Sequence, residues 1–172
     1  MTAANESDET ETRAWEVLAQ VLDPEIPVLS VVDLGIVRAI ESDGDGLDVS
    51  LSPTYSGCPA TEVIEESVKA ALTQAGLGPV RVKQVISPPW TTDWISAAGR
   101  DKLKAYGIVP PEPGQAAKSS SKLDIFGEKR TIRCPRCDSS RTSKTSEFGS
   151  TPCKASYKCA DCLEPFEYFK CI

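Results

Sequence analysis

The sequence contains no histidine. Histidine is the commonest general base near neutral pH and the commonest metal ligand in proteins. A Cys–His or Ser–His–Asp catalytic unit therefore cannot be built from this chain alone. A non-haem iron centre that uses imidazole ligands cannot be built from it either. These exclusions count against a thiol enzyme and against an oxygenase centre.

The sequence also lacks a run of residues long and apolar enough to span a membrane. Its first residues, MTAANESDETETR, are acidic and polar, whereas a secretory signal has a basic start and an apolar stretch. We therefore expect a cytoplasmic protein with no membrane partner. In that reducing compartment, seven cysteines are better explained as metal ligands or functional thiols than as disulfides.

Charge is distributed unevenly along the chain. Residues 1–57 contain twelve acidic and two basic side chains, a net charge of −10, whereas residues 118–158 contain ten basic and four acidic side chains, a net charge of +6. A basic segment is compatible with nucleic-acid binding. The whole chain is nevertheless acidic, and its aromatic residues cluster beside carboxylates in EPFEYF. We therefore rank nucleic acid below a protein partner.

Four of the cysteines form two Cys-x-x-Cys pairs, Cys134 with Cys137 and Cys159 with Cys162, separated by 21 residues. Two such pairs on either side of a hairpin-length segment are typical of a zinc ribbon, because four thiolates satisfy tetrahedral zinc. An iron–sulfur cluster on the same thiolates is the chemical alternative. We expect the metal to provide much of the stability of so small a module.

Three cysteines lie outside these pairs. Cys58 precedes Pro59, which suits the first position of a helix, so we expect the thiol at or next to a helix N-cap. A helix N-terminus stabilises a thiolate, and Gly57 leaves the sulfur uncrowded. The alternative is a cysteine that packs at the helix start. Cys153 and Cys171 are interpreted as small buried residues, with a second exposed thiol pair as the alternative.

The pattern of apolar residues predicts an α+β fold, in which a small mixed α/β domain precedes a small zinc-ribbon domain. The expected order is helix, strand, strand, helix, strand, helix. The first helix lies within 12–27 and its pattern ends at Pro24, and the other segments are 30–42, 47–52, 58–76, 80–87 and 95–108. Residues 43–46, DGDG, are expected to form a turn. We expect four regions: a disordered N-terminus over 1–11, the α+β domain over 12–108, a linker over 109–128 and the ribbon over 129–172.

Two groups of motifs resemble known families. DPEIPVLSVVDLGIV and SPTYSGCPATEVIEESV resemble the α+β domain of SufT-like iron–sulfur maturation factors, over residues 13–108. Over nearly the whole chain, the sequence is similar to the PaaD/PaaJ-like family of the aerobic phenylacetate pathway. That resemblance is carried by SPTYSGCPA, SPPWTTDWIS, GRDKLKAYGIVPP, the four-cysteine ribbon, FGSTPCKASYKC and EPFEYFKC.

The resemblance implies a non-catalytic accessory or maturation factor for the multicomponent phenylacetyl-CoA 1,2-epoxidase. Its implied partners are the oxygenase and reductase subunits, and a homodimer is compatible with it. The implied cofactors are one structural zinc ion and a transient iron–sulfur cluster. A stable structural subunit of the monooxygenase is the main alternative; a nucleic-acid-binding ribbon and a thiol enzyme rank below it.

The same resemblance implies functional residues in the first domain. It places the functional thiol at Cys58 and the Asp-Leu-Gly turn of the family at Asp33, Leu34 and Gly35. Asp33 is then expected to lie near the thiol and to orient it, with Thr61 as a weaker neighbour. One sulfur cannot hold an iron–sulfur cluster by itself, so Cys58 is expected to be one ligand of a shared cluster.

Overall fold

The computed structural model describes residues 3–42, 45–55, 57–114 and 131–170 of the chain. The chain divides into two compact units. The first contains Met1–Trp90 and Trp94–Gly99, and the second contains Thr91–Asp93 and Arg100–Ile172. Within the described residues, no helix has the length and apolar character needed to cross a membrane.

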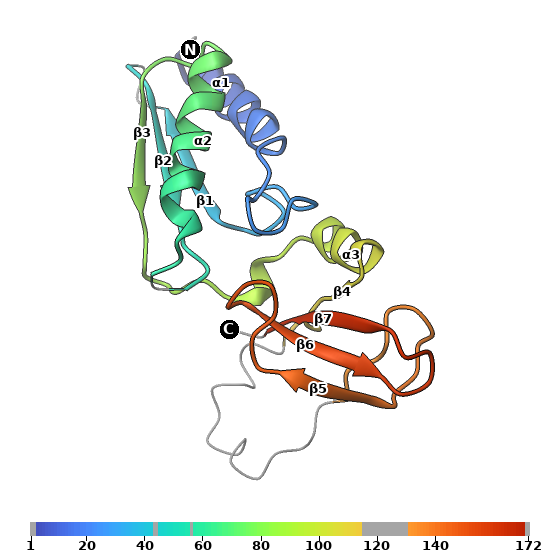
Figure 1. Cartoon of the computed structure of the whole chain (residues 1–172). Helices are drawn as coiled ribbons and strands as arrows, with labels where there is room; N and C mark the ends of the chain where they lie inside the picture. The colour runs from blue at the N-terminus through green and yellow to red at the C-terminus, as the bar shows by residue number, and fades with distance from the viewer. Residues whose placement is uncertain (1–2, 43–44, 56, 115–130, 171–172) are drawn as a thin grey trace. The chain divides into compact units, whose positions relative to one another are not determined.

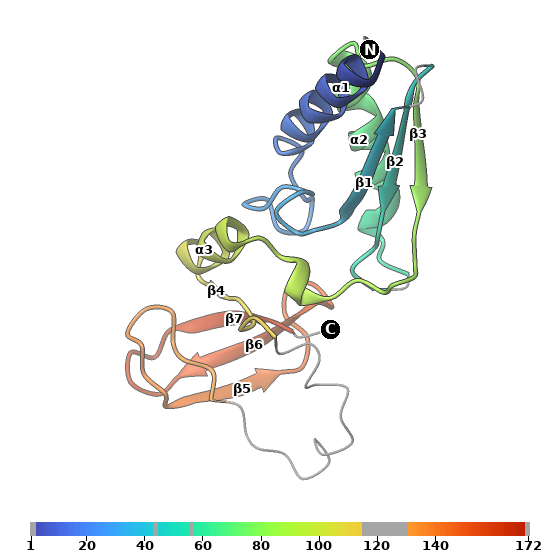
Figure 2. The ribbon, with the colours of Figure 1, turned by 180° about the vertical axis from the view of Figure 1, so that it is seen from behind.

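In the first unit, two helices pack on a three-stranded sheet (Figures 1 and 2). Its elements are α1 (Ala3–Leu18), β1 (Val37–Ser42), β2 (Leu47–Leu51), α2 (Ala60–Gln74) and β3 (Val80–Gln84). The strand order is β1-β2-β3, with β1 antiparallel and β3 parallel to β2. A parallel pair needs a crossover connection, and α2 provides it. The predicted hairpin and the predicted helix after it are confirmed.

One face of the sheet forms the core of this unit. Alternate residues of β2 are buried, and so are residues of α2 at intervals of four positions, so each element presents one apolar side to the same core. These buried residues are Leu47, Val49, Leu51, Ile64, Val68 and Leu72. On the opposite face, Asp48 forms ion pairs with Arg81 and Lys83 of β3.

The start of the chain is helical where the sequence predicted disorder over residues 1–11, since α1 begins at Ala3. Polar contacts explain the difference. Ser7 Oγ donates to Glu11 Oε1 at 3.3 Å, and the same carboxylate accepts the Ser42 N–H at 3.0 Å. Arg13 Nη2 donates to the Ala75 carbonyl oxygen at 3.0 Å. These bonds attach the polar part of α1 to β1 and to the C-terminal end of α2. This part of the helix therefore does not need the periodic apolar residues on which the sequence prediction relied.

Residues 31–35 form turns and Ser30 makes only an isolated β-bridge with Leu22, so the predicted strand 30–42 is too long at its start and β1 begins only at Val37. The reason is a set of side-chain hydrogen bonds to Asp33. Ser30 donates to Asp33 Oδ2 through its N–H at 3.2 Å and through its hydroxyl at 3.0 Å, and Asp33 N–H donates back to Ser30 Oγ at 3.0 Å. Such local bonds compete with strand pairing.

A tryptophan-rich loop covers the turn that follows Asp33. Trp90 Nε1 donates to the Leu34 carbonyl oxygen at 3.0 Å, and the Arg38 guanidinium lies 3.4 Å from the centre of the Trp94 ring. Gly35 has a φ of 68°, which favours glycine. A Cβ at Gly35 would lie 2.5 Å from the Trp94 carbonyl oxygen, so the loop can approach the turn only because this position lacks a side chain.

The second unit is a four-stranded sheet with the order β4-β7-β6-β5. Its strands are β4 (Ile108–Val109), β5 (Thr142–Ser146), β6 (Lys154–Cys159) and β7 (Pro165–Phe169). Two helical segments, η1 (Thr92–Trp94) and α3 (Ala97–Tyr106), precede β4 in the sequence. Neighbouring strands β5, β6 and β7 pair antiparallel, whereas β4 pairs parallel with β7.

The division between the units differs from the expected boundary after Ile108. The short strand β4 adds to the sheet of the ribbon, so the second unit already contains the chain from Arg100 onward. Most of the expected linker, residues 115–128, lies outside the described residues, as do Cys171 and the first half of the expected turn at 43–46.

A buried ion pair fixes the connection between β5 and β6. The Lys154 side chain is only 4% exposed, and its Nζ lies 3.1 Å from Glu167 Oε2. Glu167 also accepts the Ser150 N–H at 2.6 Å and the Ser150 hydroxyl at 3.2 Å. Burial acts to raise the pKa of Glu167, but the Ser150 N–H and the Lys154 ammonium outweigh it and lower that pKa below its ordinary value. The ammonium is buried because a carboxylate compensates it.

We predict that Gly35→Ala destabilises the first unit more than Gly76→Ala does. Both glycines have a positive φ, of 68° and 74°, so each alanine bears a backbone cost of about 1 kcal/mol. Only Gly35 has a neighbouring atom in the way, which adds about 1–3 kcal/mol of overpacking. Urea unfolding monitored by tryptophan fluorescence measures both losses, and equal losses would contradict the role given to the loop.

Candidate functional site

The four paired cysteines converge on one point. The sulfurs of Cys134 and Cys162 are 3.6 Å apart, as are those of Cys137 and Cys159. All four sulfurs lie within 4.8 Å of one another. Tetrahedral coordination with metal–sulfur bonds of about 2.3 Å requires sulfurs about 3.8 Å apart. The residues present therefore fit one metal ion with four thiolate ligands.

Tight turns bring the sulfurs of each pair to the same side. In the first pair, the Asp138 N–H donates to the Cys134 carbonyl oxygen at 2.9 Å, and Asp138 has a φ of 59°. In the second pair, the Asp161 N–H lies 3.4 Å from Cys159 Sγ and donates to it. Cys159 is the last residue of β6, so the hairpin carries the second pair toward the first.

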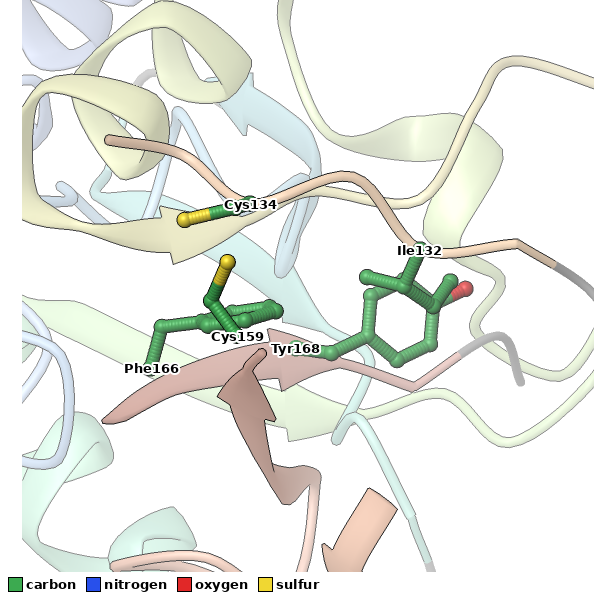
Figure 3. Packing of buried hydrophobic residues seen from close by; sticks show 5 residues of the cluster. All are labelled: Ile132, Cys134, Cys159, Phe166 and Tyr168. Atoms are coloured by element: carbon green, nitrogen blue, oxygen red, sulfur yellow. The ribbon is translucent and has the colours of Figure 1, made fainter. Parts of the chain in front are cut away.

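Two of the four clustered cysteines are also part of the small apolar core of the ribbon. Cys134 and Cys159 are buried, and Figure 3 shows them beside the side chains of Ile132, Phe166 and Tyr168. Tyr157 packs on this cluster, with its ring centroid 5.7 Å from that of Phe166. Cys137 and Cys162, by contrast, are exposed. One half of the site is therefore enclosed and the other half faces solvent.

The four thiols differ in how readily they lose a proton. The backbone N–H of Cys162, followed by neighbouring thiols, lowers the pKa of Cys159 to about 7. The Glu164 N–H acts to lower the pKa of Cys162, but desolvation and the three other sulfurs outweigh it and raise that pKa to about 12. Thiolates are the form that binds a metal, so binding displaces thiol protons and the metal affinity falls as the pH falls.

Ion pairs neutralise most of the charge on the described part of the ribbon. Residues 131–170 contain seven basic and five acidic side chains, and each acidic one is paired with a basic one. The pairs are Arg133–Asp138, Arg136–Glu164, Arg141–Asp161, Lys144–Glu147 and Lys154–Glu167. Residues 131–170 have a net charge of +2, lower than the +6 of residues 118–158, because three further acidic side chains follow Lys158.

Cys58 lies apart in the sequence, in the connection between β2 and α2 of the first unit. Pro59 is the N-cap residue of α2, so the thiol lies one position before the cap, next to the helix end as expected. The Cys58 N–H donates to the Tyr55 carbonyl oxygen at 3.3 Å, and its own carbonyl oxygen accepts the Thr61 N–H at 3.2 Å. The side chain is half-buried. Thr61 is thus a backbone neighbour of Cys58.

Asp33 holds the start of α3 as well as its own turn. Ser96 Oγ donates to Asp33 Oδ1 at 2.9 Å and accepts the Gly99 N–H at 2.8 Å, so the carboxylate orients the N-cap of this helix. Neither Ser30 nor Ser96 was predicted from the sequence, although a serine directly before a helix is a recognisable N-cap signal. That Asp33 also orients the Cys58 thiol stays a prediction.

Comparison with known proteins agrees with this two-part architecture. Residues 11–85 match the family described as iron-sulfur cluster assembly protein, and residues 118–170 match the PaaD zinc beta ribbon domain. The chain is 48% identical over 158 residues to a protein of Escherichia coli (strain K12) that is named as a subunit of a 1,2-phenylacetyl-CoA epoxidase. That match covers 92% of this chain and 91% of the relative. The chain belongs to the PaaD family.

The first unit of this PaaD-family chain has relatives of its own. It is 42% identical over 96 residues to "Fe-S protein maturation auxiliary factor YitW" of Bacillus subtilis (strain 168), covering 54% of this chain and 83% of the relative. A solved DUF59 domain of Bacillus anthracis superposes with a TM-score of 0.55 at 26% identity, covering 58% of this chain and 96% of that one. These matches confirm the α+β fold predicted from the sequence.

We predict that Cys159→Ser releases the metal and unfolds the ribbon, because it removes a buried ligand that is also a core residue. Cys153→Ser is the matched control. Cys153 is buried in the same unit and lies 3.0 Å from Thr151 Oγ1, but it is outside the sulfur cluster. Metal content per chain should fall to near zero in the first variant and stay unchanged in the second. Full metal retention by Cys159→Ser would contradict the four-sulfur site.

Proposed function

We propose that this PaaD-family protein is a non-catalytic accessory factor that helps to assemble a metal or iron–sulfur centre of the phenylacetyl-CoA 1,2-epoxidase. The observation that carries the proposal is the union of two relationships in one chain. Its first unit is similar to named Fe-S maturation auxiliary factors, and its whole length is similar to a protein named as an epoxidase subunit. A maturation domain is thereby joined to a ribbon specific to one enzyme system.

In this proposal, the ribbon metal is one zinc ion with a structural role. Four thiolates complete the coordination of tetrahedral zinc and leave no open position for water or substrate. The ribbon is then a docking module for the oxygenase or the reductase subunit. Its acidic and basic groups are largely paired with one another, which argues against the broad basic surface that nucleic-acid binding requires.

Cys58 is the residue proposed to act on the cluster. Its connection follows β2 and precedes α2, at the carboxyl end of a strand that pairs parallel with β3. Loops at this edge of parallel strands commonly carry functional groups, since the following helix directs its N-terminus toward them. A single thiolate contacts a transferred cluster but does not hold it alone. The other ligands then come from the client protein or from Cys58 of a second copy in a homodimer.

A second candidate function is a stable, non-catalytic structural subunit of the monooxygenase. The name of the Escherichia coli relative, which describes it as part of the epoxidase, favours this alternative. Stoichiometry separates the two proposals. A structural subunit purifies with the oxygenase at a fixed ratio and remains bound during turnover. A maturation factor associates with the immature enzyme and is absent from the active complex.

We predict that Cys58→Ala abolishes the production of active epoxidase while the zinc content and the fold of this protein stay intact. The substitution removes one half-buried sulfur outside both apolar cores, so its structural cost is small. The test is co-expression of the variant with the other epoxidase subunits, followed by measurement of epoxidation and of the iron and sulfide content of the reductase.

Cys153→Ala is the control, because it removes a buried thiol that the proposal gives no role. It should leave epoxidase production unchanged as long as the ribbon folds. Normal epoxidation and a fully loaded reductase with the Cys58→Ala variant would reduce Cys58 to a packing residue and remove the maturation proposal.

A further inference from the structure

A set of polar side chains joins the two Cys-x-x-Cys turns of the metal centre. Asp161 lies between the two cysteines of the second pair, yet its carboxylate contacts residues that follow the first pair. The Ser139 hydroxyl donates to Asp161 Oδ2, and Arg141 Nη2 forms an ion pair with Asp161 Oδ1. We call these three residues, Ser139, Arg141 and Asp161, the clasp.

Each end of the clasp is bonded to a buried metal ligand. On one side, the Asp161 N–H donates to Cys159 Sγ at 3.4 Å. On the other, the Ser139 carbonyl oxygen accepts the Cys134 N–H at 3.0 Å. Ser139 Oγ also accepts the Arg141 N–H at 3.0 Å, which fixes the direction in which its own proton points. The clasp therefore connects Cys134 to Cys159 through hydrogen bonds and the Arg141–Asp161 ion pair.

We propose that Asp161 is a positioning residue for the metal centre. Through Ser139 and Arg141, its carboxylate holds the two cysteine turns at the spacing that a tetrahedral ion requires, and it thereby slows the loss of the ion. The inference depends on the metal site of the ribbon and not on the role proposed for Cys58. Failure of the clasp would therefore leave the maturation proposal untouched, and the reverse also holds.

The physical argument follows the path of metal loss. A four-coordinate ion leaves in steps, and the exposed ligands Cys137 and Cys162 are the first that solvent or a chelator can replace. The ion then remains on the buried pair, Cys134 and Cys159, one from each turn. It escapes when these turns separate, and the clasp opposes that movement. Partners of metal ligands outside the first coordination sphere typically change metal affinity by about 10–100-fold.

The first pair contains a natural control. Asp138 directly follows Cys137, and its carboxylate pairs with Arg133 at 2.9 Å, a residue at the beginning of the same turn. This ion pair is local and joins nothing across the site. Asp138 has a φ of 59°, so glycine replaces it without backbone strain. Asp138→Gly and Asp161→Ala thus each remove one carboxylate beside a ligand cysteine, but only the second breaks the clasp.

The experiment compares the full-length, zinc-loaded protein with these two variants. Transfer of zinc to an excess of a chromogenic chelator is followed over time. We expect Asp161→Ala to release zinc about 10-fold faster than the unmodified protein and Asp138→Gly to stay within about twofold of it. The absorption spectrum of the cobalt-substituted protein provides a second readout, because a distorted sulfur tetrahedron shifts its bands.

Ser139→Ala tests the same clasp without changing any charge. Ser139→Ala should also make zinc release faster. The double variant with Asp161→Ala should release zinc no faster than the faster of the two single variants, because both substitutions remove the same hydrogen bond. Equal release from Asp161→Ala and Asp138→Gly would overturn the proposal. If Asp161→Ala cannot be isolated with zinc, Ser139→Ala decides, and unchanged release from it would equally overturn the proposal.

Discussion

The ribbon is organised around four cysteine sulfurs that lie within 4.8 Å of one another. Two of the five residues in its buried cluster, Cys134 and Cys159, belong to the four-cysteine set that fits one metal ion, so a bound ion and the apolar core would stabilise the same contacts. Units of about 40 residues seldom bury enough apolar surface to fold without a metal, a disulfide or a partner.

The core of the first unit contains none of the four clustered cysteines. Its core consists of fully buried aliphatic side chains from both helices and the sheet, among them Leu18, Val49 and Leu72. Cys58 lies outside that core and is half-buried, next to the N-terminal end of α2. A thiol that contributes little to packing is available for chemistry. The chain thus separates the four clustered cysteines of the ribbon from Cys58, the residue proposed to contact a client.

Elements whose apolar residues recur at one regular spacing were predicted correctly from the sequence. The alternation in β2 and the four-residue spacing in α2 correctly gave a strand and a helix, and the spacing of the cysteine pairs correctly gave a ribbon. The apolar run before β1 was misread as strand, since Ser30 and Asp33 bond locally and turn the chain there. The polar start of α1 was missed because its support comes from Ser42 and Ala75, which are distant in the sequence.

The finer organisation of the site required the structure for the same reason. Ser139 and Asp161 are 22 positions apart, and only the β5–β6 hairpin brings them into contact. The pairing of β4 with β7 likewise joins segments separated by a long stretch of chain. Because of this pairing, the division between the units lies within α3, before Arg100, and not after Ile108 as the sequence predicted. Local sequence patterns carry no information about such pairings, whereas the spacing within each cysteine pair is local and was sufficient to predict which four sulfurs lie together.

The central claim is that four cysteines bind structural zinc while Cys58 remains a separate, accessible thiol. The most direct test is purification without oxygen, followed by metal and sulfide analysis and by alkylation of the native protein with mass-spectrometric assignment of each cysteine. We expect one zinc per chain, no sulfide, alkylation at Cys58, and protection of the four ribbon cysteines until a chelator is added. Iron and sulfide bound to the ribbon cysteines, or alkylation of those four cysteines in the metal-loaded protein, would contradict the account.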